Sequence, residues 1–133
     1  MPEARKRVLV VDDDPTFRKI AERALTDEAV EVDTAEDGSV AIGKLGAAHF
    51  DLVIVDLEMP RTDGFGVIKH VRGDARTTTT PIIVITGKTN LSAIDKAYQL
   101  GASAFVSKPV NWRLLPFKVK DTLAQGPHAK PIR

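Results

Sequence analysis

The sequence predicts an α/β fold: a five-stranded parallel sheet with helices on both of its faces. Short apolar runs alternate with segments of helical periodicity, and this succession of strand–helix units is typical of parallel sheets with right-handed crossovers. The runs at residues 8–11 and 52–55 lack polar alternation, which indicates strands buried on both faces. Each of these runs ends in aspartate, and open parallel sheets bind ligands at the carboxyl ends of their strands.

Length and composition describe one ordinary globular domain, with 133 residues, 43% of them hydrophobic and 28% charged. The formal net charge of +1 gives no long-range field toward nucleic acid or a membrane, and the lack of cysteine excludes disulfides, thiolate metal sites and thiol nucleophiles. No apolar run approaches the length of a membrane span, so we expect a cytoplasmic protein. We expect a flexible N-terminus at residues 1–4, one domain at 5–125 and a disordered tail at 126–133.

The first half of the chain predicts three strands, each followed by a helix. After the strand at 8–11, Asp14 is suited to cap a helix and Pro15 to occupy its first turn, where a missing N–H costs nothing. The alternating residues 30–33 predict an outer strand. There follow a weaker helix over about 39–47, the buried strand at 52–55 and a helix over about 64–72.

The second half predicts two more strand–helix units. A threonine-rich loop leads to a strand at 82–85, after which Asn90 is suited to cap a helix and Gly101 to end it. After a strand at 104–107, the last helix aligns four apolar side chains: Trp112, Leu115, Val119 and Leu123. Pro116 falls early in this helix, where it removes a backbone hydrogen bond and delays or kinks the helix start.

Candidate site residues follow four of the five predicted strands. They are Asp12, Asp13 and Asp14 after the first, Asp56 after the third, Thr86 and Gly87 after the fourth, and Lys108 and Pro109 after the fifth. In a doubly wound sheet of strand order 2-1-3-4-5, strands one and three adjoin, so their ends form one crevice. The capping role explains Asp14 completely, whereas carboxylates at two adjacent strand ends are hard to explain by packing alone.

This cluster favours a hard metal ion and phosphoryl chemistry. Two carboxylates about 4 Å apart repel by roughly 4 kcal/mol at an effective dielectric of about 20, so the cluster calls for a cation. Oxygen ligands without cysteine or histidine beside them favour Mg²⁺, with Mn²⁺ or Ca²⁺ as alternatives. With a metal ion, a hydroxyl and an ammonium beside it, a carboxylate can attack a phosphoryl group while the cations neutralise the phosphoryl oxygens.

The chain resembles the receiver domain of bacterial two-component response regulators, the chemotaxis-Y-like family with a flavodoxin-like fold. Five signatures carry the resemblance in order and spacing: Val-Asp-Asp, Asp-Leu-Glu-Met-Pro with Asp-Gly, Ile-Thr-Gly, Gly-Ala-Ser-Ala-Phe and Ser-Lys-Pro. Each signature alone is weak, whereas the ordered set is specific and covers about residues 5–125.

The resemblance implies a role for each residue at the strand ends. Asp56 would be the phosphoacceptor. Asp13 and Asp56 would bind Mg²⁺ directly, Asp12 would act through water, and the main-chain carbonyl of Glu58 would complete the metal site. Thr86 and Lys108 would hold the phosphoryl group.

The resemblance also implies a conformational switch. Thr86 would move toward the phosphoryl group and Phe105, which stands where the family often has tyrosine, would follow. Residues that tune dephosphorylation in the family correspond to Glu58, Gly87 and Lys88. The peptide bond before Pro109 would be cis, as is usual in receivers.

Two other interpretations fit the chain less well. Residues 12–16 satisfy the Asp-x-Asp-x-Thr pattern of haloacid-dehalogenase-like phosphohydrolases, and residues 85–87 resemble their second motif. However, no acidic pair follows a late strand, there is no room for a cap domain, and residues 56–60 stay unexplained. A non-catalytic flavodoxin-like binding module predicts a glycine-, serine- or threonine-rich phosphate loop where this chain has three aspartates.

We therefore expect a phosphorylation-dependent protein switch rather than an enzyme, either a single-domain regulator or part of a longer one. Its phosphoryl donor would be a sensor histidine kinase or a histidine phosphotransfer protein. Its fourth helix, fifth strand and fifth helix would form a basic face with interleaved aromatic residues: Lys88, Lys96, Lys108, Arg113, Lys118 and Lys120, with Tyr98, Phe105 and Trp112. This face would bind a protein target or a second copy, and neither nucleic acid nor a membrane.

Several residues receive no functional role from the sequence. Trp112 and Phe117 are expected to pack in the core or at its edge. The histidines show no metal-ligand spacing and are expected to be surface or filling residues: His49, His70 and His128.

Overall fold

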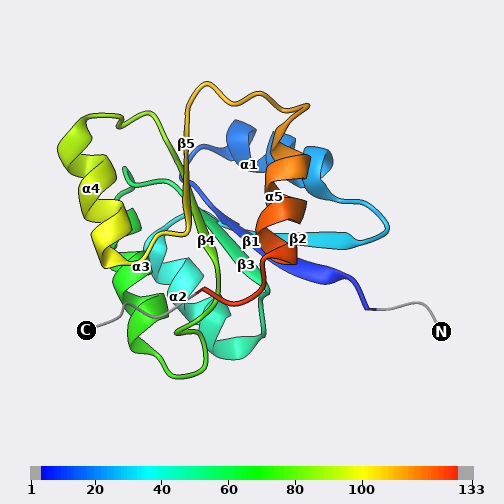
Figure 1. The fold of residues 1–133 in the computed structure, drawn as a ribbon, viewed down its shortest axis with the longest axis horizontal. Coiled ribbons are helices and arrows are strands. Elements are labelled where there is room, and N and C mark those ends of the chain that lie inside the picture. The colour runs from blue at the N-terminus through cyan, green and yellow to red at the C-terminus, as the bar shows by residue number, and fades with distance from the viewer. Residues whose placement is uncertain (1–3, 129–133) are drawn as a thin grey trace.

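A computed structural model of the protein describes residues 4–128, which form a five-stranded parallel sheet flanked by helices (Figure 1). The strand order is β2-β1-β3-β4-β5, so the predicted fold class and topology are confirmed. The strands are β1 (Lys6–Val11), β2 (Val30–Ala35), β3 (Leu52–Val55), β4 (Ile82–Thr86) and β5 (Ala104–Ser107). The helices are α1 (Pro15–Leu25), α2 (Gly38–Ala47), α3 (Gly64–Gly73), α4 (Leu91–Leu100) and α5 (Leu115–Ala124).

The sheet divides the hydrophobic core into two halves. Figure 1 shows α1 and α5 on one side of the sheet and α2, α3 and α4 on the other. Successive residues of β1 alternate between the halves: Leu9 and Val11 pack toward α2 and α3, whereas Val8 and Val10 pack toward α1 and α5. Because every residue of β3 and β4 is also buried, the continuous apolar runs belong to strands covered on both faces, as predicted.

Side-chain caps set four of the five helix starts. Asp14 accepts a hydrogen bond from the Thr16 N–H, and Asn90 accepts one from the Ala93 N–H, so both predicted caps are confirmed. Asp37 and Asp63 cap α2 and α3 in the same way.

The fifth helix starts later than predicted. It begins at Leu115, with Pro116 in its first turn and no side-chain cap, so Trp112 lies in the preceding turn and not on the helical stripe. The reason is that Pro116 has no N–H to donate and is tolerated only where no intrahelical donor is needed.

The ladder between β1 and β2 extends beyond the predicted ends of both strands. β1 begins at Lys6 and β2 ends at Ala35, because the two strands pair continuously from Lys6 with Val30 to Val11 with Ala35. This pairing includes charged residues whose side chains stay accessible at the edge of the sheet, and apolar periodicity does not report them.

The end of the described chain runs back to the sheet. Gly126 turns the chain with φ 78°, and the His128 N–H donates to the Thr79 carbonyl. The rest of the predicted flexible N-terminus and disordered tail, residues 1–3 and 129–133, lies outside the described residues. Within residues 4–128, no helix combines the length and apolar character needed to cross a membrane.

Candidate phosphoryl and metal site

An acidic cluster lies at the carboxyl edge of the sheet, where β1 and β3 end side by side. The parallel pairing of Val11 with Val55 places the next residues, Asp12 and Asp56, beside each other. Carboxylate oxygens of Asp12, Asp13 and Asp56 all lie within 4.8 Å of one another. Asp12 and Asp56 are buried, whereas Asp13 is exposed. The structure thus brings together the three carboxylates that the sequence predicts at this edge.

Lys108 enters the cluster from the end of β5 and bonds two of the carboxylates. Its Nζ donates to Asp12 Oδ2 at 2.8 Å and to Asp56 Oδ2 at 2.9 Å. The peptide bond between Lys108 and Pro109 is cis, as the resemblance implies. Burial lowers the pKa of Lys108, but the hydrogen bonds to Asp12 and Asp56 outweigh it and raise the pKa above its usual value. Lys108 is therefore a cation at neutral pH.

Main-chain N–H groups fix the other oxygen of each buried carboxylate. Asp12 Oδ1 accepts from the Asp14 N–H at 2.9 Å, and Asp56 Oδ1 accepts from the Glu58 N–H at 3.1 Å. Burial raises the pKa of Asp12 above its ordinary value, although Lys108 and the Asp14 N–H oppose that shift. The loss of water therefore disfavours the charged form of Asp12.

Gly64 lets α3 begin directly against the end of β3. A Cβ at Gly64 would lie 2.2 Å from the main-chain oxygen of Asp56, closer than any side chain permits. The Asp-Gly pair of the sequence motif therefore has two structural roles here: Asp63 caps α3, and Gly64 allows the close approach.

Thr86 and Phe105 lie on the neighbouring strands. Thr86 ends β4, is fully buried and accepts a hydrogen bond at Oγ1 from the Lys88 N–H at 3.2 Å. Phe105 is half-buried on β5 and packs against the core on the α2–α4 side. Three residues at the predicted tuning positions are exposed: Glu58, Gly87 and Lys88.

Two residues beside the cluster have no role in the sequence interpretation. The Lys108 Nζ lies 4.3 Å from the centroid of the Phe17 ring. The Phe17 ring in turn contacts Trp112, with centroids 5.1 Å apart. The Arg18 guanidinium donates to the Asp12 carbonyl at 2.7 Å. Sequence spacing gave no signal for the two contacts of Phe17, because they join α1 to the end of β5 and to the β5–α5 connection. The Arg18 contact is local and spans six residues.

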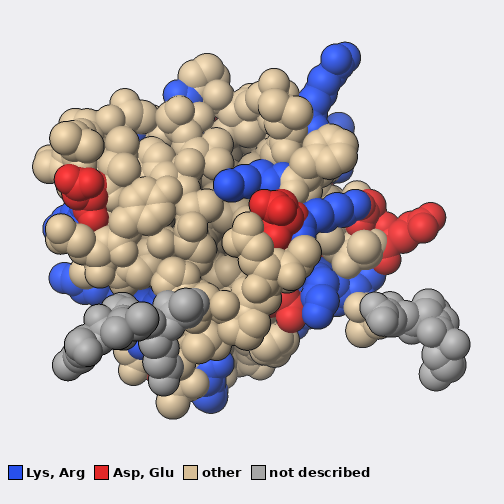
Figure 2. Space-filling model, viewed as in Figure 1, with Lys and Arg blue, Asp and Glu red and all other residues tan. Residues whose placement is uncertain are grey.

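The predicted basic face is less basic than its residue types indicate. Lys108 points into the acidic cluster, Lys96 lies over the Phe65 ring at 4.4 Å, and Lys120 pairs with Asp27 on the α1 side at 2.6 Å. Figure 2, viewed as Figure 1 with β5 in front, shows a broad surface without charge over α4 and β5 and charged side chains toward its margins.

Exposed apolar side chains are the main feature of that face. Leu91 and Tyr98 of α4 are 73% and 46% exposed, and Leu114 and Phe117 at α5 are 60% and 72% exposed. The expectation that Phe117 packs at the core edge is therefore wrong. Phe117 falls roughly 200° around α5 from the buried Leu115, so it faces away from the sheet. We call Leu91, Tyr98, Leu114 and Phe117 the apolar face.

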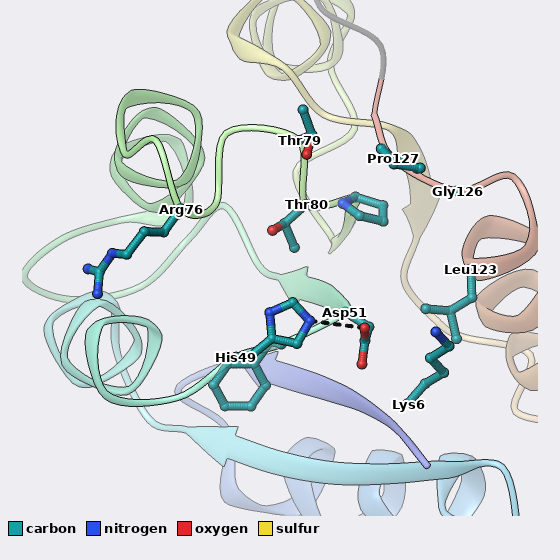
Figure 3. Close-up of a pocket in the computed structure, with 11 residues that line it drawn as sticks. Lys6, His49, Asp51, Arg76, Thr79, Thr80, Leu123, Gly126 and Pro127 are labelled. Atoms are coloured by element: carbon teal, nitrogen blue, oxygen red, sulfur yellow. Dashed lines mark hydrogen bonds and ion pairs between the residues drawn. The ribbon is translucent and has the colours of Figure 1, made fainter. Parts of the chain in front are cut away.

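A separate shallow pocket lies at the opposite, amino-terminal edge of the sheet (Figure 3). The His49 ring lies 3.1 Å from Asp51 across its floor, and Lys6, Thr79 and Thr80 stand around it. It shares no residue with the acidic cluster. The carboxyl edge, with its convergent carboxylates and ammonium, is therefore the better candidate for phosphoryl and metal chemistry.

The donor set of the acidic cluster suits a divalent metal ion. Three carboxylates lie together and one ammonium bonds two of them, so acidic groups are in excess, and the exposed Asp13 leaves the cluster open to solvent. Carboxylate oxygens are the ligands that hard divalent cations prefer. The same arrangement offers Asp56 as a nucleophile beside a fixed cation.

Comparisons with known proteins agree with this geometry. The family model "Response regulator receiver domain" matches residues 8–120. The transcriptional regulatory protein ResD of Bacillus subtilis is 34% identical over 120 residues, which are 90% of this chain and 49% of that protein. A probable transcriptional regulator, ycf27 of Porphyridium aerugineum, is 31% identical over 90% of this chain and 48% of its own length. The chain thus spans about half the length of the curated relatives it matches.

Solved structures give the same result for the fold. Chemotaxis protein CheY4 of Vibrio cholerae superposes with a TM-score of 0.84 at 34% identity, covering 90% of this chain and 99% of that one. A CheY-like receiver domain protein of Methanospirillum hungatei has a TM-score of 0.86 at 28% identity, covering 92% of this chain and 96% of that one.

Proposed function

The chain belongs to the response regulator receiver family, the phosphoacceptors of two-component signalling, and on that premise we propose that Asp56 is the residue that accepts the phosphoryl group. The observation that carries this assignment is the position of the Asp56 carboxylate. One oxygen is held by the Glu58 N–H and the other by the Lys108 ammonium, within 4.8 Å of Asp12 and Asp13. A receiver is a phosphoacceptor and not a classical enzyme.

The transfer would proceed at the Asp56 oxygen that now bonds Lys108. That oxygen attacks the phosphorus of a phosphohistidine or of a small acyl phosphate, and a new O–P bond forms. The bond from phosphorus to the histidine nitrogen, or to the acyl oxygen, breaks, and the leaving group keeps its electron pair. Lys108 would stay within reach of both Asp56 and the incoming phosphoryl oxygens, where its charge opposes the developing negative charge.

We assign the metal site to Mg²⁺, with Mn²⁺ or Ca²⁺ able to replace it. Asp13, Asp56 and the Glu58 carbonyl would bind the ion directly, and Asp12 would act through water. A bound divalent cation would neutralise phosphoryl oxygens during the transfer. The support is the convergence of oxygen donors around the exposed Asp13, together with the absence of cysteine from the chain.

We further propose that Thr86 and Lys108 bind the phosphoryl group and that Thr86 and Phe105 carry the signal. Thr86 is buried at the end of β4 beside the cluster, and Phe105 is half-buried on the next strand, so both could change position together. Glu58, Gly87 and Lys88 would tune the lifetime of the phosphorylated state. A Cβ at Gly87 would meet nothing within 4 Å, so this side of the site is open to water.

Receivers partner with histidine kinases, and a sensor kinase or a histidine phosphotransfer protein is the donor we propose. The output partner, a protein target or a second copy of this chain, would bind the surface formed by α4, β5 and α5. The exposed side chains of the apolar face support protein contact through aromatic and aliphatic anchors. The proposal includes no direct contact with nucleic acid or a membrane, and places the protein in the cytoplasm.

The test is phosphorylation by acetyl phosphate, followed by intact mass. Wild-type protein should gain one phosphoryl group when Mg²⁺ is present and lose it in acid or base, as acyl phosphates do. Asp56→Asn should gain none. Asp51→Asn, which changes a carboxylate at the opposite edge of the sheet, should behave as wild type. Turnover of a phosphomonoester with the label on Asp12 would contradict the proposal and favour a hydrolase.

A further inference from the structure

Two aromatic side chains form a support under the Lys108 ammonium. Phe17, in the first turn of α1, is only 8% exposed, and the centroid of its ring lies 4.3 Å from the Lys108 Nζ. Trp112, four residues after Lys108, contacts the Phe17 ring at 5.1 Å with the two ring planes inclined by 54°. Both rings belong to the same core half as α1 and α5. We call Phe17 and Trp112 the aromatic support.

We propose that Phe17, held by Trp112, is a positioning residue that keeps the Lys108 ammonium at the acidic cluster during phosphoryl transfer. This inference rests on the proposed function of Asp56 and Lys108 and adds the residue that acts through Lys108.

The Lys108 side chain is held at the cluster by few contacts. A lysine side chain is a flexible four-carbon chain that ends in a compact charge, and its three N–H donors hold it only through directional hydrogen bonds. Two of those bonds go to Asp12 and Asp56. A carboxylate oxygen of the exposed Asp13 lies within 4.8 Å of theirs, so it is a further acceptor close to the ammonium. Hydrogen bonds alone would therefore leave the ammonium free to shift whenever one carboxylate changes partner.

The Phe17 ring adds an attraction for the Lys108 ammonium that does not depend on hydrogen-bond direction. The face of a ring attracts a cation without requiring a hydrogen-bond direction. An ammonium over Phe17 can therefore exchange a carboxylate oxygen for a phosphoryl oxygen and stay at the same place. Phosphorylation of Asp56 requires that exchange, because Lys108 now bonds the oxygen that would become phosphorylated.

Among the cations that lie over rings in residues 4–128, Lys108 is the one at the acidic cluster. Two other cations in the described chain lie over rings: Arg7 over Phe50 at 4.8 Å and Lys96 over Phe65 at 4.4 Å. Neither of these cations contacts the acidic cluster. Phe50 is buried like Phe17 but lies at the opposite edge of the sheet, so it is a matched control for the loss of a buried ring.

The first measurement is structural. In wild-type protein, the ring current of Phe17 should move the NMR signals of the Lys108 ε-methylene group away from those of the other lysines. The shift should disappear in Phe17→Leu, persist in Phe17→Tyr, which keeps the ring face, and persist in Phe50→Leu. Wild-type Lys108 signals without this shift would overturn the proposal.

The second measurement is the rate of Asp56 phosphorylation by acetyl phosphate, at Mg²⁺ concentrations that saturate each variant in thermal stabilisation. Phe17→Leu should react about two- to fivefold more slowly, the range expected for a partly exposed cation–π contact. Phe17→Tyr should restore the rate, and Phe50→Leu should keep it even if its stability falls. Equal rates for Phe17→Leu and Phe50→Leu would overturn the proposal. Wild-type protein that gains no phosphoryl group would instead refute the role of Asp56, and the Lys108 signals would still decide whether Phe17 positions the ammonium.

Discussion

At the scale of single residues, neighbouring aspartates have different roles that follow from their surroundings. Asp13 is exposed at the cluster, whereas Asp14 accepts from the Thr16 N–H at 2.9 Å as the cap of α1. The two residues adjoin in sequence and share one chemistry. Their difference therefore gives a direct test of the metal assignment.

Asp13→Ala and Asp14→Ala should separate metal binding from helix capping. Asp14→Ala should lower the free energy of unfolding by about 1 kcal/mol through the lost cap, yet keep the stabilisation by Mg²⁺. Asp13→Ala should lose most of that stabilisation, which for wild type is about 1.4 kcal/mol at a Mg²⁺ concentration near ten times Kd. The measurement is thermal unfolding with and without Mg²⁺. Equal loss of the Mg²⁺ response in both variants would show that the ligands are assigned wrongly.

The residue scale also shows where sequence reasoning ends. The convergence of Asp12, Asp13 and Asp56 could be predicted, because the carboxyl ends of adjacent parallel strands meet at one edge. The contact of Lys108 with Phe17 could not, because it joins residues far apart in the chain through packing that no local pattern encodes.

At the scale of elements, β4 and β5 connect the site to the surface. The pair is in register from Ile83 with Ala104 to Thr86 with Ser107, so the buried Thr86 and the half-buried Phe105 lie on adjacent strands. A ligand can shift such a pair of elements only by binding one arrangement more tightly than the other.

Thr86→Ala should uncouple phosphorylation from the signal. The variant should still accept a phosphoryl group on Asp56, because the nucleophile and Lys108 are unchanged. The shift of the Phe105 ring signals on phosphorylation should be smaller, since the hydroxyl that would bond the phosphoryl oxygen is gone. NMR spectra before and after acetyl phosphate provide the comparison, and a full-size shift in Thr86→Ala would contradict the coupling.

The apolar face should carry the partner contact. Tyr98→Ala together with Phe117→Ala should reduce by tenfold or more the affinity of phosphorylated protein for a protein target or a second copy, because aromatic anchors dominate such contacts. Lys118→Glu should weaken the contact, whereas Lys96→Glu should matter less because Lys96 lies over Phe65. Sedimentation velocity and target titration measure both cases. Binding that survives the aromatic pair, or that proves to be to DNA with a steep salt dependence, would contradict the assignment.

At the scale of the whole molecule, the end of the described chain fastens α5 to the amino-terminal edge of the sheet. The His128 N–H donates to the Thr79 carbonyl at 2.7 Å, and the His128 Nδ1 lies 2.9 Å from Ser103 Oγ. Ser103 Oγ already accepts from the Ile82 N–H, so its own hydroxyl proton is available to His128. Arg72 binds the flanking carbonyls of Thr78 and Thr80.

This attachment should weaken in acid. Burial, and then the charge of Arg72, lower the pKa of His128 below its ordinary 6.5. The unfolded chain therefore binds the proton more readily than the folded one, so the contribution of His128 is complete above pH 6.5 and is lost as the pH falls through the folded value. NMR titration should give a His128 pKa below its ordinary 6.5. A His128 pKa at or above 6.5 would contradict the attachment.

Strand order and layers were predictable from the sequence because buried runs, caps and strand ends are local signals. The exposure of Phe117 and the contacts of His128 were not, because each depends on what a neighbouring element covers. The same limit applies to the surface of α4, β5 and α5, whose residue types indicated a basic face. In the structure, Lys108 and Lys120 pair with aspartates and Lys96 lies over the Phe65 ring.

Chemical trapping of the acyl phosphate tests whether Asp56 carries the phosphoryl group. Protein treated with acetyl phosphate and Mg²⁺ is reduced with borohydride, which converts a phosphorylated aspartate to homoserine, and is then mapped by tandem mass spectrometry. We expect homoserine at position 56 alone, and none when Mg²⁺ is omitted or Asp56 is replaced by Asn. Homoserine at position 12 or 13 would contradict it.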